Sequence, residues 1–94
     1  MSIAVKQTAS GEPMEFEVEV QQGRTRTRHR VTLDAATFER LARGGSAVDL
    51  VRGAFEFLLE RESAQSILST FDLTVISRYF PEFEREIGRY QKKR

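Results

Sequence analysis

The sequence predicts an α+β fold, in which an antiparallel β-hairpin precedes three to four helices that pack on one face of it. Residues 14–33 alternate charged and apolar side chains with the period of two that a β-strand imposes. Residues 34–91 instead repeat apolar side chains at the three- and four-residue spacing of amphipathic helices. We expect residues 1–94 to form one small globular domain, with residues 1–13 partly flexible and residues 92–94 a frayed tail.

Composition and charge argue against several classes of function. Fifteen basic and 14 acidic residues leave a net charge of +1, which gives no general attraction to nucleic acid or to an anionic membrane. The chain has no cysteine, so disulfides and thiolate chemistry are excluded. No apolar run approaches the ~20 residues that cross a bilayer, and the N-terminus lacks the pattern of a signal peptide. We therefore expect a cytoplasmic protein that is not associated with a membrane.

The N-terminal residues leave open a third strand of the sheet. Ile3 and Val5 alternate with polar neighbours within residues 2–7, which is compatible with a short strand. Residues 8–13 contain Gly, Pro and small polar side chains, and this composition indicates a loop.

The predicted hairpin carries opposed charges on one face. The charged positions are Glu15, Glu17 and Glu19 in the first strand and Arg24, Arg26, Arg28 and Arg30 in the second. A turn at residues 22–23 pairs Glu19 with Arg26, and we favour this register. A turn at residues 23–24 pairs Glu19 with Arg28 and keeps every side chain on the same face. In either register the arginines have acidic partners in the same molecule.

Two helices follow the hairpin, and their ends have clear capping residues. Asp34 suits the N-cap of the first helix, which Gly44 and Gly45 stop. Ser46 suits the N-cap of the second and longest helix. The apolar stripe of that helix consists of Leu50, Val51, Ala54, Phe55, Leu58 and Leu59.

The C-terminal third predicts further helical segments around a bend. Residues 63–69 are compatible with one extra helical turn, and Asp72 suits the N-cap of a helix over residues 73–79. Pro81 bends the chain and can begin a last helix. We expect the aromatic residues at the bend, Tyr79 and Phe80, to belong to the core, because so short a domain needs most of its aromatic side chains inside.

No set of side chains predicts catalysis, a metal site or a cofactor. The only histidine, His29, lies on the less polar face of its strand, where a neutral histidine at the edge of the core is expected. Gly44, Gly45 and Ser46 lack the spacing and the lysine of a phosphate-binding loop. The carboxylates of residues 82, 84 and 86 fan around a helix among arginines, which predicts a solvated face of mixed charge. We therefore expect a protein that is not an enzyme.

Residues 28–62 resemble a ribbon-helix-helix DNA-binding domain. The shared elements are a basic strand over residues 28–33, a short helix over residues 37–42, a glycine-containing turn and a longer helix that opens at Ser46. The resemblance implies a dimeric β-ribbon in which Arg28, Arg30 and Thr32 contact DNA. The glutamate strand competes with this interpretation, because it neutralises the arginines and uses the same strand edge.

A second resemblance covers most of the chain. Residues 60–62 and 66–84, with the pattern ILxxFDLxxIxRYFPEFE, are similar to a group of short bacterial proteins without an assigned function. This resemblance implies a shared fold and a bacterial origin, and it brings no catalytic residue or ligand.

The function that these observations favour is a small non-enzymatic binding or interaction module. Its partner would be another protein of unknown identity, or a second copy bound through residues 79–81 or an open strand edge. The alternative is a DNA-binding regulator of the ribbon-helix-helix type, which the neutralised arginines disfavour.

Overall fold

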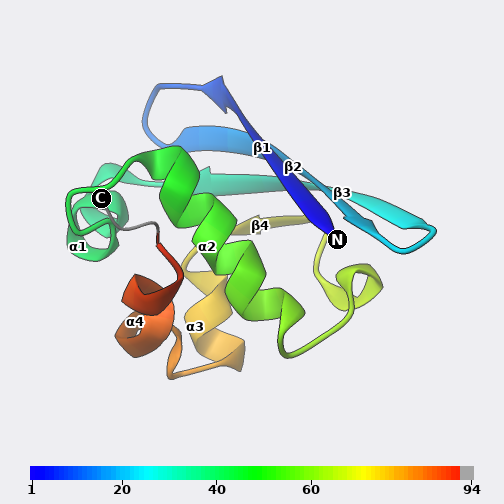
Figure 1. The fold of residues 1–94 in the computed structure, drawn as a ribbon. Coiled ribbons are helices and arrows are strands. Elements are labelled where there is room, and N and C mark those ends of the chain that lie inside the picture. Colours follow the sequence, from blue (N-terminus) through cyan, green and yellow to red (C-terminus); the bar gives the residue numbers. More distant parts are fainter. Residues whose placement is uncertain (92–94) are drawn as a thin grey trace.

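The computed structural model describes residues 1–91 and has two layers, a four-stranded sheet and a group of helices that covers one of its faces (Figure 1). The strands are β1 (Ser2–Ala9), β2 (Met14–Gln22), β3 (Thr25–Leu33) and β4 (Thr70–Asp72), in the spatial order β1-β2-β3-β4. The helices are α1 (Ala35–Leu41), α2 (Ala47–Leu59), η1 (Ala64–Ser66), α3 (Val75–Tyr79), α4 (Phe83–Glu86) and η2 (Ile87–Tyr90), of which η1 and η2 are 3₁₀ helices. The predicted α+β class is confirmed, and the N-terminal strand that the sequence left open is present.

The hairpin of β2 and β3 has the second of the two registers that the sequence allows. Glu19 pairs with Arg28, so the favoured pairing of Glu19 with Arg26 is wrong. The turn consists of Gly23 and Arg24, and Gly23 has a φ of 62°. A type II′ turn requires a positive φ at its first central residue, where glycine is unstrained, and this requirement favours the observed register. Because the two registers differ by two residues, every side chain remains on its predicted face.

The apolar face of the hairpin forms the sheet side of the core. Its fully buried side chains are Phe16, Val18, Val20, Val31 and Leu33. Ile3 and Val5 of β1 extend this surface and pack against the same core. Their burial under the helices provides the stabilisation that a hairpin alone lacks in water.

Two of the three predicted N-caps are confirmed, and the third, Asp72, does not cap its helix, because α3 begins after Thr74. The Asp34 carboxylate accepts a hydrogen bond of 2.7 Å from the Thr37 backbone N–H, and this bond lowers the pKa of Asp34. The Ser46 hydroxyl accepts a bond of 3.0 Å from the Asp49 backbone N–H. Each bond satisfies a donor that the first turn of a helix leaves without a partner.

Helix α2 is buried on two sides, which its predicted apolar stripe does not indicate. Phe55 faces the sheet and lies 5.2 Å from the His29 ring, measured between ring centroids. Phe57 is two residues further along the helix and points to the opposite side. Its ring packs against the Phe83 ring, with 5.1 Å between the ring centroids. Gly53 lies one turn before Phe57, and a Cβ there would come within 3.1 Å of the Tyr90 carbonyl oxygen. The sheet therefore packs on one side of α2, and α4 and η2 pack on the other.

The C-terminal part differs from the prediction in three respects. The region predicted as helical contains β4, which pairs in parallel with residues 30–32 of β3. Helix α3 begins at Val75 rather than residue 73, because Leu73 donates its backbone N–H to the Thr32 carbonyl and so continues the contact with β3. The last helix begins at residue 83 and continues as η2, and the predicted tail at residues 92–94 lies outside the described residues.

Candidate binding pocket

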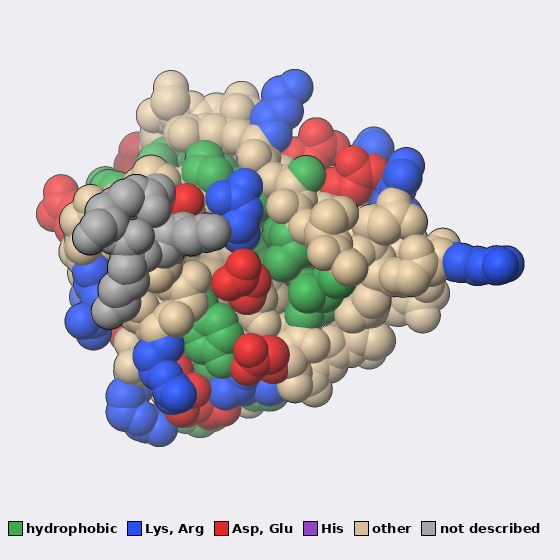
Figure 2. All heavy atoms as spheres, viewed as in Figure 1, with side chains coloured by type: hydrophobic (Ala, Val, Ile, Leu, Met, Phe, Trp, Pro, Cys, Tyr) green, Lys and Arg blue, Asp and Glu red, His purple; other side chains and the backbone are tan. Residues whose placement is uncertain are grey.

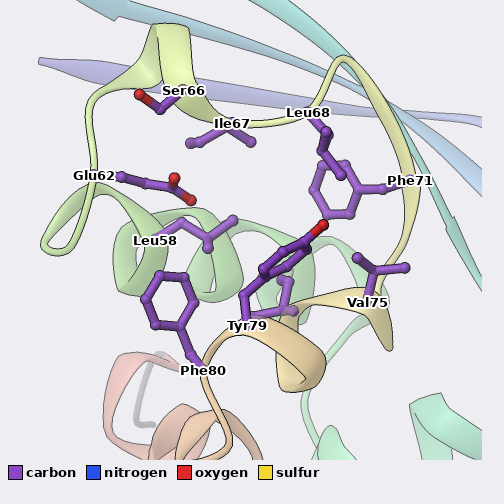
Figure 3. Close-up of a pocket in the computed structure, with 10 residues that line it drawn as sticks. Leu58, Glu62, Ser66, Ile67, Leu68, Phe71, Val75, Tyr79 and Phe80 are labelled. Carbon is purple, nitrogen blue, oxygen red and sulfur yellow. The ribbon is translucent and has the colours of Figure 1, made fainter.

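A pocket of about 240 Å³ opens between the C-terminal end of α2, the loop after η1, β4 and α3 (Figure 3). Its lining is mostly apolar and consists of Leu58, Glu62, Ser66, Ile67, Leu68, Phe71, Val75, Ile76, Tyr79 and Phe80. These residues come from four segments between residues 58 and 80, so the pocket exists only when the segments pack together.

The loop that forms one wall of the pocket is tied to β3. The Arg30 backbone N–H donates to the Ser69 carbonyl at 2.7 Å. The His29 Nδ1 donates to the Leu68 carbonyl at 2.7 Å, and its Nε2 lies 2.9 Å from the Thr27 hydroxyl. A carbonyl can only accept, so the hydrogen of the ring is on Nδ1. His29 is buried, as predicted; Nδ1 ties this wall to β3, and the bond of Nε2 stays within β3.

The opposite wall is fixed where β4 leads into α3. The Asp72 carboxylate accepts hydrogen bonds from the Thr32 hydroxyl at 2.7 Å and from the Thr74 hydroxyl at 2.6 Å. It also accepts the Thr74 backbone N–H at 3.1 Å. Asp72 therefore stabilises the turn before α3 instead of capping the helix itself. Val75 and Tyr79 of α3 line the pocket beyond this turn (Figure 3).

The rim of the pocket exposes large apolar side chains. Within residues 1–91, the exposed large hydrophobic side chains are Met1, Leu68 and Tyr79. Leu68 is 48% exposed and Tyr79 is 66% exposed, and both border this pocket. The expectation that Tyr79 belongs to the core is wrong, because α3 is a short helix at the surface and only Ile76 among its residues is buried.

Glu62 places one carboxylate in this apolar lining. Its side chain points toward the pocket beside Leu58 and Ile67 (Figure 3). Among the described residues its carboxylate has no hydrogen bond or ion pair, and partial burial raises the pKa of this carboxyl group. Within residues 1–91, no Lys, Arg or His lines the pocket, and Glu62 is the only charged side chain of the described lining.

Arg61, the residue before Glu62, points away from the pocket and belongs to a cluster with side chains of α2 and α4. Its guanidinium lies 3.6 Å from the centre of the Phe57 ring and contacts Glu82 and Glu86, each at 3.3 Å. This cluster joins the end of α2 to α4 and leaves Arg61 unable to neutralise Glu62. Two of the three carboxylates that the sequence placed on a mixed-charge face therefore share one arginine, and the third, Glu84, binds Arg40 of α1 at 2.8 Å.

The sheet face away from the helices carries the arginines and glutamates of the hairpin. The ion pairs are Arg26–Glu19 and Arg28–Glu17, both at 3.5 Å, Arg28–Glu19 at 3.7 Å and Arg30–Glu15 at 3.3 Å. Three of the four pairs are diagonal rather than directly opposite, since long side chains reach across the strand twist. Basic and acidic side chains also lie interspersed on the face shown in Figure 2.

The residues implied by the ribbon-helix-helix resemblance lie on this open sheet face. Arg28 and Arg30 are exposed but paired with glutamates, and Thr32 donates its hydroxyl to Asp72. Strand β4 occupies the edge of β3 at residues 30–32, so that part of β3 cannot pair with a second chain as a ribbon. The dimeric ribbon implied by the resemblance does not fit this sheet, and DNA contact through these residues stays a prediction.

Within residues 1–91, no group of three or more His, Cys, Asp or Glu side chains is placed to hold a metal ion. None of the helices described there is long and apolar enough to cross a membrane. No family model, curated protein or solved structure matches the chain.

Proposed function

We propose that this protein is a small non-enzymatic interaction module, and that its pocket receives an apolar side chain from a partner protein. The observation that carries the proposal is the position of Leu68 and Tyr79, two strongly exposed apolar side chains on the rim of one apolar pocket. Exposed apolar side chains gathered at a concave site are typical of binding surfaces, whereas scattered ones need no explanation.

The polar groups of the pocket support binding rather than catalysis. The Ser66 hydroxyl lies 3.2 Å from the Ser63 hydroxyl, and within residues 1–91 no side-chain hydrogen bond joins either hydroxyl to a base that would activate it as a nucleophile. Both ring nitrogens of His29 are engaged in hydrogen bonds, Nδ1 with the Leu68 carbonyl of the loop and Nε2 with the Thr27 hydroxyl of β3. We also propose that the protein is bacterial, because residues 66–84 are similar to short bacterial proteins, and that it is cytoplasmic, because of the composition of the chain.

Photo-crosslinking in bacterial cells tests the proposal. Replacing Tyr79 by benzoylphenylalanine should give a discrete adduct on irradiation, and mass spectrometry of the adduct identifies the partner. An adduct composed of two copies of the chain would assign the pocket to self-association. The same label in place of Glu39, an exposed residue of α1 outside the pocket, is the control. The proposal is wrong if position 79 gives no adduct beyond those of position 39.

A further inference from the structure

The size of the pocket suits one side chain of a partner. Sites for drug-sized molecules and cofactors commonly have volumes of roughly 300–1,000 Å³. The pocket here has about 240 Å³ and an exposed rim, so it accommodates a single large apolar side chain while the rest of a partner segment stays outside.

Glu62 determines which charge can accompany that side chain. Its carboxylate lies at the pocket without a partner among the described residues, and Arg61 beside it is held by Phe57, Glu82 and Glu86. A neutral partner that covered the pocket would remove water from this carboxylate and give no charge in return, which costs free energy. An anionic partner would add repulsion. A cation would form a charge-assisted hydrogen bond in surroundings that are partly screened from water.

We propose that the pocket selects a protein segment in which an apolar anchor residue is followed by a lysine or arginine, whose cationic group pairs with the Glu62 carboxylate. This inference rests on the proposed function, because it assumes that a protein side chain occupies the pocket. It adds the charge of the partner segment, which the apolar lining alone does not specify.

Two matched peptides and backbone-amide NMR test the inference. The probes are the N-acetylated, C-amidated tetrapeptides Ala-Phe-Lys-Ala and Ala-Phe-Gln-Ala, which share the aromatic anchor and differ in the cation. We expect both to shift the resonances of pocket residues such as Ile67 and Val75. The lysine peptide should bind about fivefold more tightly, which is the upper range for a partly exposed ion pair. This preference should weaken at high salt.

Two substitutions separate the role of Glu62 from a general effect of charge. In Glu62→Gln the two peptides should bind equally, because the side chain keeps its shape and loses its charge. Glu39→Gln removes the same charge from α1, outside the pocket, and should keep the preference for lysine. Unchanged spectra away from the pocket show that both variants are folded.

The outcomes distinguish this inference from the function on which it rests. Equal affinities of the two peptides for the unmodified protein would overturn the selection for a cation and leave the pocket as a binding site. If neither peptide shifts the pocket resonances at millimolar concentration, the proposed function also fails. Shifts of the same resonances on simple dilution, with a doubled molar mass by light scattering, would replace the partner segment by a second copy of the chain.

Discussion

The open face of the sheet and the pocket differ in whether their charged side chains have partners of opposite charge. On the sheet, arginines 26, 28 and 30 each lie within 3.7 Å of a glutamate, so many charges leave little net field. In the pocket, Glu62 is a single charge in an apolar lining without a described partner. The pairing of charges, rather than their number, therefore indicates where a partner would bind.

The substitution with the largest expected effect breaks the core that both regions share. The Phe55 ring is fully buried between His29 of β3 and Phe71 of the pocket, with centroid distances of 5.2 Å and 6.0 Å. Phe55→Ala should lower the free energy of unfolding by about 3–5 kcal/mol in urea denaturation followed by circular dichroism. Tyr79→Ala on the exposed rim should change it by less than about 0.5 kcal/mol. Similar losses in the two variants would contradict the burial described for these aromatic residues.

The next largest effect concerns the cluster that keeps Arg61 away from the pocket. Arg61→Ala should lower the free energy of unfolding by about 1–3 kcal/mol, because it removes the contact with the Phe57 ring and leaves Glu82 and Glu86 without this partner. Arg61→Lys keeps the charge but loses the planar fork, so it should recover only part of the loss. Arg89→Ala, which removes a 77% exposed arginine 3.8 Å from Glu86, is the control. Equal losses of stability in Arg61→Ala and Arg89→Ala, measured by thermal denaturation, would show that the cluster stabilises the fold no more than an exposed ion pair does.

A smaller effect is expected when the charge pattern of the sheet is broken. Arg28→Glu places a third negative charge beside Glu17 and Glu19. It should lower the free energy of unfolding by about 1 kcal/mol or less at low salt. The loss should shrink between about 0.05 M and about 1 M salt. Adding Glu19→Arg should restore part of the stability. The control is Arg24→Glu in the turn. If the loss of stability in Arg28→Glu does not depend on salt concentration, its cause is not ion pairing.

The smallest effect isolates the unpaired charge of the pocket. Burial raises the pKa of Glu62 above its ordinary value of 4.5, so the folded state disfavours the ionised form. The proton on this group therefore stabilises the fold at low pH, and this contribution is lost as pH rises through the folded pKa. Glu62→Gln should raise the melting temperature near pH 7 by a small amount, and the gain should vanish below about pH 4. Glu39→Gln, at an exposed position outside the pocket, is the control, and an equal response of the two variants would remove the argument for a partly buried charge at position 62.

The sheet was the more predictable region because its information is local. Alternation over residues 14–33 assigns every side chain of the hairpin to a face, and the caps at Asp34 and Ser46 mark where two helices begin. The register was wrong because Gln-Gly and Gly-Arg turns differ little by composition, and the positive φ of Gly23 decided between them.

The pocket was not predictable, because its residues come from segments that only packing brings together. The apolar stripe of α2 omitted Phe57, which is buried because α4 and η2 cover a second side of the helix. One signal in the sequence did point to Glu62. Its neighbours three and four positions away are Leu58, Leu59, Gln65 and Ser66, so no basic residue can pair with it along a helix.

The amino-acid sequence by itself determined the class of the fold, the faces of the hairpin and the starts of α1 and α2, because these depend on neighbours within a few residues. Tertiary structure alone decided that β4 adds to the sheet in parallel, that Tyr79 is exposed and that Glu62 meets an apolar pocket. These features depend on contacts between residues far apart in the chain, and no local pattern of side chains specifies such contacts.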